Sequence, residues 1–298
     1  MTISKGVFPV AGLGTRFLRA TKAQPKEMLP IVDKPTIQYV VEEAMQSGIN
    51  DFLFVTGKDK RALEDYFDHS GELERHLLEK GKTDLLALVR NISNMCQMHY
   101  VRQKQPLGLG HAVWCARQHV GNEYFAVLLG DDIVVSPKPC LKQMIEVYEQ
   151  VKTPVLALRQ VSRADVSSYG VIEGESLGNG LWRITDLVEK PDADEAPSDL
   201  AVIGRYILPP DIFPILEDLE PGVGGEIQLT DALKELLKTH TIVGYEFEGM
   251  RYDVGDPKGF LIATVEMALA REDIGEEFGK YLAELVRERD LQPDRSSK

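Results

Sequence analysis

The chain has 298 residues, of which 43% are hydrophobic, so it can bury a large core and fits one α/β domain, with or without an appended piece. Its 34 Lys and Arg against 47 Asp and Glu give a formal net charge of −13, which argues against nucleic-acid binding because phosphate backbones are held by basic patches. The sequence contains no N-terminal apolar leader and no apolar run of about 20 residues, so we expect a cytoplasmic protein without membrane contact.

The first predicted strand, Val7–Val10, runs into a glycine-rich loop, Ala11-Gly12-Leu13-Gly14-Thr15-Arg16, and Lys22 and Lys26 follow. The backbone N–H groups of such a loop can wrap a phosphate. Arg16 adds a charged fork that matches phosphate oxygens. The loop therefore predicts a polyphosphate site and nucleotide chemistry.

Two familiar nucleotide loops do not fit this segment. A dinucleotide-binding fingerprint that begins at Gly12 needs a small residue where Phe17 stands, because the helix must pack closely on the strand there. The ATPase phosphate loop needs Gly-Lys followed by Ser or Thr, whereas this chain has Gly14-Thr15-Arg16. A redox dinucleotide-binding protein is therefore disfavoured.

Apolar strands and amphipathic helices alternate through the first half, which is typical of βαβ units in a mostly parallel sheet. The predicted elements are Val7–Val10, Ile37–Met45, Phe52–Val55, Leu63–Phe67, Tyr100–Val101, Ala112–Ala116 and Phe125–Leu129. Ligands gather at the carboxyl ends of such strands. The glycine-rich loop and Gly130-Asp131-Asp132 both fall on that edge.

A charged helical insert over 60–94 is consistent with a solvated face, a lip over the site or a contact between subunits. From Val155 onward strands separated by turns predict an antiparallel extension. A helix, a strand and two further helices complete the chain, and residues 292–298 are expected to be a disordered tail. The elements of this second half are Val155–Leu158, Gly170–Ile172, Trp182–Val188, Val202–Leu208, Ile227–Leu237, Ile242–Phe247, Phe260–Ala270 and Phe278–Val286.

Cysteine and histidine spacing indicates neither a disulfide framework nor a transition-metal site. The cysteines are Cys96, Cys115 and Cys140, an odd number with wide spacing. The six histidines lack the spacing of known zinc motifs. A divalent metal held by carboxylates remains open.

Taken together, the motifs resemble the bacterial UTP–glucose-1-phosphate uridylyltransferases, a branch of the sugar-phosphate nucleotidylyltransferase family. The resemblance runs from about residue 5 to residue 268, with the motifs in the family's order. They are Ala11–Arg16, Pro25–Pro30, Gln103 with Leu107–Ala112, Gly130–Asp132, Tyr169–Ile172, Val188–Pro191 and Asp253–Gly255.

This resemblance implies a Rossmann-like mixed, mostly parallel sheet with flanking helices and an antiparallel extension for the sugar. Residues 1–270 would form one domain, with a nucleotide-binding part over about 1–150 and a sugar-binding part over about 151–256. A C-terminal helix would span 271–291. The implied reaction joins UTP and glucose 1-phosphate to give UDP-glucose and pyrophosphate, in a homodimer or homotetramer.

Such a reaction needs no general base, because the attacking phosphate oxygen is already ionised, so catalysis rests on positioning and charge neutralisation. By the resemblance, Arg16 grips the leaving phosphates, Lys26 contacts the α-phosphate and Lys190 holds the sugar phosphate. Asp131 and Asp253 are the implied ligands of Mg²⁺. Asp132 is left without an assigned role.

The remaining implied contacts divide between the nucleotide and the hexose. Gln103 can donate to and accept from the base through its amide. Glu189 and Gly170 are expected beside the hexose. Glu27 either orients Lys26 or touches the nucleotide. The nucleotide-binding residues are Ala11, Gly12, Gly14, Thr15, Glu27, Gln103 and Gly108.

One position departs from the family pattern, because Arg19 stands where a proline is usual in Phe-Leu-Pro-Ala-Thr-Lys. The change frees φ and adds a cation near the triphosphate.

Two alternative functions stay open at this point. A thymidylyltransferase differs by one methyl of the base, worth about 1–3 kcal/mol, and a non-catalytic sugar-nucleotide sensor could use the same fold.

Overall fold

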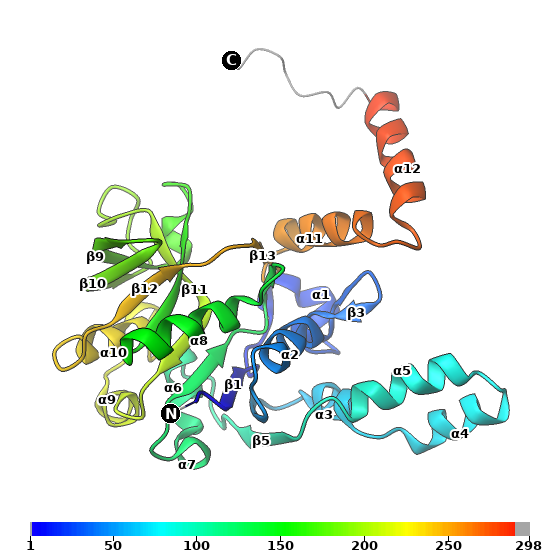
Figure 1. Ribbon diagram of the computed structural model, residues 1–298, viewed down its shortest axis with the longest axis horizontal. Helices are drawn as coiled ribbons and strands as arrows, with labels where there is room; N and C mark the ends of the chain where they lie inside the picture. The colour runs from blue at the N-terminus through cyan, green and yellow to red at the C-terminus, as the bar shows by residue number, and fades with distance from the viewer. Residues whose placement is uncertain (1, 290–298) are drawn as a thin grey trace.

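The computed structural model describes residues 2–289 (Figure 1), so the predicted tail over 292–298 lies outside the described part. Within it, nine strands form one sheet in the order β5-β4-β1-β6-β11-β8-β12-β10-β9. These strands are β1 (Lys5–Pro9), β4 (Asp51–Thr56), β5 (Met98–Arg102), β6 (Phe125–Leu128), β8 (Val155–Gln160), β9 (Gly170–Gly178), β10 (Leu181–Glu189), β11 (Leu200–Leu208) and β12 (Val243–Glu246).

The sheet is mixed, and its two halves are continuous. β1 runs parallel to β4 and β6, and β4 runs parallel to β5. β11 then enters antiparallel between β6 and β8, and β10 pairs antiparallel with β9 and β12. The predicted fold class is confirmed, and the antiparallel strands begin in the middle of the sheet.

Helices cover both faces of the sheet because side chains alternate along each strand. In β1, Val7 packs into one core and Phe8 into the other. The Phe8 face is covered by α2 (Thr36–Gln46), α3 (Arg61–Phe67) and α8 (Cys140–Val151). The Val7 face is covered by α6 (Leu109–Cys115), α7 (Arg117–Val120), α9 (Ile212–Asp218) and α10 (Leu229–Leu236).

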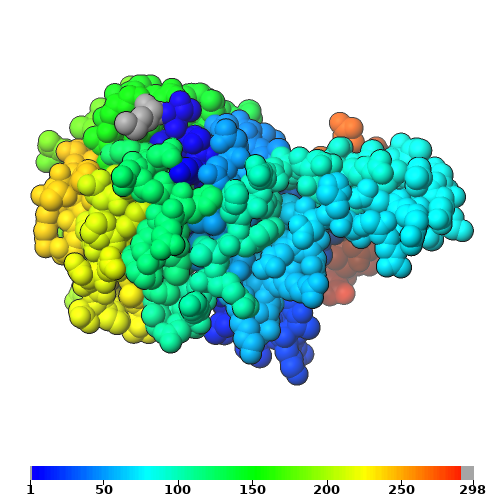
Figure 2. Space-filling view, turned by 90° about the horizontal axis from the view of Figure 1, so that it is seen from below, coloured from blue at the N-terminus to red at the C-terminus, as the bar shows by residue number. Residues whose placement is uncertain are grey.

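Two pairs of helices lie outside this layered body (Figure 1). Figure 2 shows the cyan segment that contains α4 (Gly71–Glu79) and α5 (Thr83–Ser93) projecting from one side. α11 (Pro257–Leu269) packs beside the short strand β2 (Pro30–Ile31), and α12 (Gly275–Glu288) turns away from the body. No helix within residues 2–289 combines the length and apolar character needed to cross a membrane. The cytoplasmic location stays a prediction.

Several short elements complete the fold. β7 (Asp132–Val135) pairs with β13 (Met250–Asp253), and β2 (Pro30–Ile31) pairs with β3 (Lys34–Pro35). The pairing of β7 with β13 places Asp132 opposite Asp253. The remaining short elements are single turns of helix: η1 (Thr15–Phe17), α1 (Leu18–Thr21), η2 (Lys26–Met28), η3 (Val166–Ser168) and η4 (Val223–Gly225).

Candidate active site

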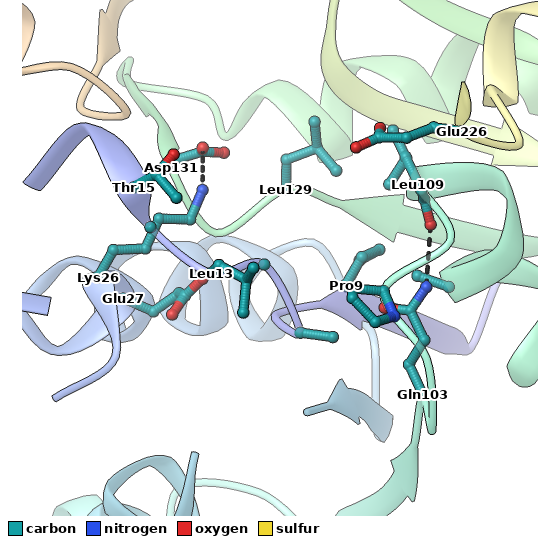
Figure 3. A pocket seen from close by; sticks show the side chains of 16 residues that line it. Pro9, Leu13, Thr15, Lys26, Glu27, Gln103, Leu109, Leu129, Asp131 and Glu226 are labelled. Atoms are coloured by element: carbon teal, nitrogen blue, oxygen red, sulfur yellow. Dashed lines mark hydrogen bonds and ion pairs between the residues drawn. The ribbon is translucent and has the colours of Figure 1, made fainter. Parts of the chain in front are cut away.

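The glycine-rich loop after β1 forms one wall of a pocket of about 440 Å³, called the first pocket here (Figure 3). Gly14 adopts a left-handed conformation with φ of 65°, which glycine adopts without steric cost. A Cβ at Gly14 would lie 3.1 Å from Thr21 Cγ2 and 3.2 Å from Lys26 Cβ. The loop therefore has room to fold back over Lys26 only because this position carries no side chain.

A second pocket of about 240 Å³ adjoins the first along the same sheet edge. It is lined by residues from the antiparallel half of the chain, including Tyr169, Glu189 and Lys190, and by Arg16 from the first loop. The two pockets share part of their lining, namely Leu109, Leu129, Asp131 and Glu226. A molecule in one pocket would thus meet a molecule in the other at Asp131.

Asp131 stands at this junction and is paired with Lys26, whose Nζ lies 2.5 Å from Asp131 Oδ2. Burial opposes ionisation of Asp131, but Lys26 lowers the pKa of this carboxyl below its ordinary value. Burial likewise acts to lower the pKa of Lys26, while Asp131 and Glu27 raise it above the ordinary value. Both groups are therefore charged at neutral pH.

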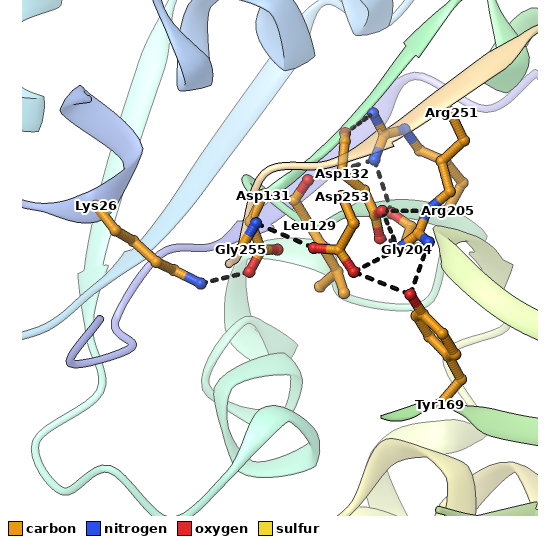
Figure 4. Close-up of polar contacts among 10 residues, drawn as sticks. All are labelled: Lys26, Leu129, Asp131, Asp132, Tyr169, Gly204, Arg205, Arg251, Asp253 and Gly255. Atoms are coloured by element: carbon orange, nitrogen blue, oxygen red, sulfur yellow. Dashed lines mark hydrogen bonds and ion pairs between the residues drawn. The ribbon is translucent and has the colours of Figure 1, made fainter. Parts of the chain in front are cut away.

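Asp253 comes from β13 and lies in a polar network with Tyr169 and Arg251 (Figure 4). The hydroxyl of Tyr169 donates to Asp253 Oδ2 at 3.0 Å, and Arg251 Nη2 donates to the same oxygen at 3.1 Å. Arg251 also donates through Nε to Asp132 Oδ1 at 2.6 Å. One guanidinium thus fixes two carboxylates that the sequence places far apart.

The arrangement of Asp131 and Asp253 fits a divalent cation. A Cβ built on Gly255 would lie 3.0 Å from Asp131 Oδ2 and 3.1 Å from Asp253 Oδ1, so the two oxygens face one small space that the glycine leaves free. Carboxylate oxygens are the ligands that Mg²⁺ prefers. Lys26 on Asp131 shows that this oxygen already attracts a cation.

Asp132 has a different setting, although it is the next residue. Its side chain is buried, and its Oδ2 accepts a hydrogen bond from Gly204 N at 3.0 Å. Burial raises the pKa of this carboxyl, and the nearby Asp253 and Asp131 add to that rise while Arg251 opposes it. Asp132 therefore joins the loop to β11 and to Arg251.

Glu27 and Gln103 both line the first pocket, but each is tied to protein partners. Glu27 is 1% exposed, and its Oε2 accepts from Lys60 Nζ at 2.9 Å. The amide of Gln103 donates to Gly108 O at 3.0 Å and contacts His111 Nδ1 at 3.0 Å, and burial lowers the pKa of His111. The carboxylate of Glu27 is therefore neutralised by Lys60, while Gln103 retains its carbonyl oxygen as an acceptor.

The second pocket is built around Glu189. Its Oε2 accepts from Thr230 Oγ1 at 2.6 Å, and its Oε1 lies 3.1 Å from Lys190 Nζ. A Cβ on Gly170 would come within 2.7 Å of Thr230 Oγ1 and 3.3 Å of Glu189 Oε2. The glycine therefore makes room for the hydrogen-bonded pair.

Lys190 has a backbone φ of 46°, a region that costs a residue with a side chain about 1–3 kcal/mol. Its N–H donates to Tyr169 O at 2.9 Å, which holds this conformation at the end of β10. The Lys190 side chain is exposed to the second pocket. Strain of this kind is typical of functional positions.

The structure brings every residue predicted for the site to one of the two pockets. The first pocket is lined by Ala11, Gly12, Gly14, Thr15, Lys26, Glu27, Gln103, Gly108 and Asp131. The second is lined by Arg16, Asp131, Gly170, Glu189, Lys190 and Asp253. Arg19, the departure from the family pattern, is exposed on α1 and lines neither pocket.

Sequence reasoning missed several polar residues, chiefly Arg251, Thr230 and Lys60. For Arg251 a signal existed, because it lies two residues before Asp253 on a strand and so shares its face. Thr230 and Lys60 carry no comparable signal, since their partners lie 41 and 33 residues away.

This arrangement can bind two anions side by side, one in each pocket. Lys26 and Arg16 come from the glycine-rich side and Lys190 from the opposite side, with Asp131 and Asp253 between them. The groups supply positive charge and a place for a metal ion. The polar walls of the second pocket suit a ligand with several hydroxyl groups.

Comparison with known proteins agrees with this geometry. The model of the nucleotidyl transferase family matches residues 5–269. A UTP–glucose-1-phosphate uridylyltransferase of Bacillus subtilis (strain 168) is 50% identical over 289 residues, which is 97% of this chain and 99% of that protein.

Two solved structures are similar over most of the chain. A UDP-glucose pyrophosphorylase complexed with UDP-glucose is 49% identical, with a TM-score of 0.84 over 91% of this chain and 100% of that one. A UTP-bound UGPase from Acinetobacter baumannii is 42% identical, with a TM-score of 0.88 over 95% of this chain and 100% of that one.

Proposed function

The chain belongs to the nucleotidyl transferase family, and we propose that it transfers the uridylyl group of UTP to glucose 1-phosphate, giving UDP-glucose and pyrophosphate. The observation that carries this proposal is the junction of two pockets at Asp131, with cations on both sides. The 50% identity to a uridylyltransferase favours UTP over dTTP. It also favours an enzyme over a non-catalytic sensor.

In this reaction a phosphate oxygen of glucose 1-phosphate attacks the α-phosphorus of UTP. A new bond forms between them while the bond from the α-phosphorus to the bridging oxygen breaks, and pyrophosphate leaves with that electron pair. UTP lies in the first pocket and the sugar phosphate in the second, so the reacting atoms meet beside Asp131 and Lys26. Catalysis consists of alignment and charge neutralisation.

Each cation has a place in this scheme. Arg16 lines the second pocket but directly follows the glycine-rich loop, and we assign it to the β- and γ-phosphates that leave, which the loop over 11–15 wraps with backbone N–H groups. Lys26 neutralises the α-phosphate. Lys190 holds the phosphate of the sugar, next to Glu189, which accepts hydrogen bonds from hexose hydroxyls.

The base is recognised at the back of the first pocket. Gln103 has its amide nitrogen bound to Gly108 O, so its carbonyl oxygen is the group that accepts from the imide N–H of uracil. Gly108, with φ of 105°, lets the backbone approach the ring. The backbone of Ala11 and Gly12 completes this wall.

Asp131 and Asp253 would hold Mg²⁺ beside the α-phosphate. When bound, the ion supplies positive charge to the phosphate oxygens that gain negative charge during displacement. Arg251 and Tyr169 orient Asp253 for that role. Lys26 keeps Asp131 ionised.

The products test the proposal directly. Purified protein is incubated with glucose 1-phosphate or galactose 1-phosphate and with UTP or dTTP in the presence of Mg²⁺, and sugar nucleotides are separated by chromatography. UDP-glucose is the expected main product. A larger yield of dTDP-glucose would move the chain to thymidylyl transfer, and no product with any pair would support the sensor alternative.

Assembly into a homodimer or homotetramer is part of the same proposal. Large apolar side chains are exposed on the two projecting helix pairs, including Leu78 and Leu88 on α4–α5 and Leu261 and Tyr281 on α11–α12. Exposed apolar groups on arms of this kind are favourable contacts between subunits. Light scattering after size-exclusion chromatography is expected to give a mass of two or four chains, and a monomer at assay concentration would contradict it.

A further inference from the structure

We propose that Asp51, His99 and His119 form a binding site for one Zn²⁺ ion near the amino-terminal ends of β4 and β5. The active site lies at the other end of these strands. Sequence spacing gave no sign of it, because the three residues come from different elements. Among the described residues, their ligand atoms all lie within 4.8 Å of one another. The proposal is independent of the proposed function.

Strand register explains why these side chains meet. In the parallel pair of β4 and β5, Leu53 is the partner of His99. Asp51 is two residues before Leu53, so its side chain lies on the same face as those of Leu53 and His99. Leu53 packs into the core under α6 and α7, and this is therefore the face that α7 covers.

His119 reaches the same place from α7. The next residue, Val120, is fully buried in that core and fixes the short helix on the sheet. His119 Nε2 then lies 2.7 Å from Asp51 Oδ1, and His99 Nε2 lies 3.8 Å from the same oxygen. The two imidazole rings are 4.7 Å apart between centroids.

These separations suit a zinc ion. Zinc binds imidazole nitrogen and carboxylate oxygen at about 2.0–2.2 Å, which puts tetrahedral ligands about 3–4 Å from each other. The 3.8 Å separation of His99 and Asp51 falls in that range. The 2.7 Å contact of His119 with Asp51 is a hydrogen bond, and the ion would replace it by moving these two atoms apart by less than about 1 Å. Two imidazoles and one carboxylate also prefer zinc to magnesium, which selects oxygen ligands.

The site is accessible and is not already filled by a protein cation. Asp51 and His119 are 28% and 24% exposed, and His99 is 46% exposed. The nearby ammonium of Lys5 is occupied by His119 O, Val120 O and Glu123 Oε1. An ion could therefore enter from solvent and keep a water molecule as its fourth ligand.

The test is equilibrium dialysis of the full chain against Zn²⁺, with excess Mg²⁺ present to occupy the oxygen site near Asp131. We compare the wild type with His99→Gln, His119→Gln and, as a matched control, His76→Gln on the projecting α4. The wild type and the control are expected to bind one tight Zn²⁺. Each site variant is expected to bind at least about tenfold more weakly, since even outer-shell changes cost 10–100-fold.

A second readout distinguishes this site from the active site. Co²⁺ bound to nitrogen ligands gives visible absorption bands, which are expected to disappear in His119→Gln and to persist in Asp131→Asn. Circular dichroism confirms that the variants are folded. Equal Zn²⁺ affinity in all four proteins, several weak ions per chain, or Co²⁺ bands that depend on Asp131 would each overturn the proposal.

Discussion

Asp131 and Asp132 are neighbours in the sequence, but their carboxylates have different partners. Asp131 faces the pocket junction and Lys26, whereas Asp132 is buried against Gly204 and Arg251. The sequence alone could assign the first and not the second, because the difference depends on which way each side chain turns.

Replacing Asp131 by Asn removes one charge from the metal site and the partner of Lys26. We expect kcat for UDP-glucose formation to fall by about a hundredfold or more, the scale for loss of one electrostatic contact to a transition state. The protein should remain folded, with some loss of thermal stability because Lys26 loses its ion-pair partner. Undiminished turnover at saturating Mg²⁺ would show that Asp131 has no catalytic role.

Lys190→Ala removes a cation that lines the second pocket and not the first. We expect a higher KM for glucose 1-phosphate together with a lower kcat, while the affinity for UTP alone, measured by calorimetry, is unchanged. Lys152→Ala is a matched control, since Lys152 also has a positive φ, of 53°, and lies at the end of α8. If the substitution weakened UTP binding as much as sugar-phosphate binding, the assignment of Lys190 to the sugar phosphate would be contradicted.

At the scale of elements, a buried ion pair supports the site from behind. Arg205 on β11 is fully buried, and its Nη2 lies 2.7 Å from Glu43 Oε2 on α2. The same guanidinium donates to Asp132 O at 2.7 Å, and Glu43 accepts from Leu141 N at the start of α8. The Glu43–Arg205 ion pair thus connects α2, α8, β11 and the loop that carries Asp131.

Arg205→Met would leave Glu43 buried without its partner. Loss of one member of a buried pair costs about 3–5 kcal/mol, and we expect the free energy of unfolding in urea to fall by about that amount. The double variant Glu43→Gln/Arg205→Met should recover part of the loss, because no charge is then left unpaired. A single-variant loss below about 1 kcal/mol would mean that the pair does not support the fold.

The turn before α6 depends on Gly108. A Cβ there would lie 2.8 Å from both Glu226 Cβ and Ile227 O, and Ile227 N donates to Leu107 O at 2.7 Å. Gly108→Ala must therefore separate segments that line both pockets. We expect a higher KM for UTP and a loss of stability of about 1–3 kcal/mol from backbone strain alone.

Gly121→Ala is the control for this prediction. Gly121 also has a positive φ, of 65°, but no atom lies within 4 Å of a Cβ built there. It should lose stability to a similar strain and keep its KM for UTP. If both variants raise that KM equally, the close approach at Gly108 has no bearing on the base.

For the molecule as a whole, the sequence predicted the alternating first half and the two loops that carry Arg16 and Asp131, because strand ends and glycine-rich loops have local signals. It did not predict α8, although Leu141, Met144, Ile145 and Tyr148 have the spacing of a buried helical face. The sequence also did not predict the contacts between distant segments. The hydrogen bond from Tyr169 to Asp253 spans 84 residues, and only the folded sheet brings such residues together.

The central claim is that UTP and glucose 1-phosphate react where the two pockets meet, with a divalent metal held there. The most direct measurement is pyrophosphate release by the purified chain with both substrates and Mg²⁺, with and without EDTA, and with either substrate omitted. We predict rapid release that requires both substrates and stops with EDTA. Release that continues without glucose 1-phosphate or in EDTA, or no release at all, would contradict the account.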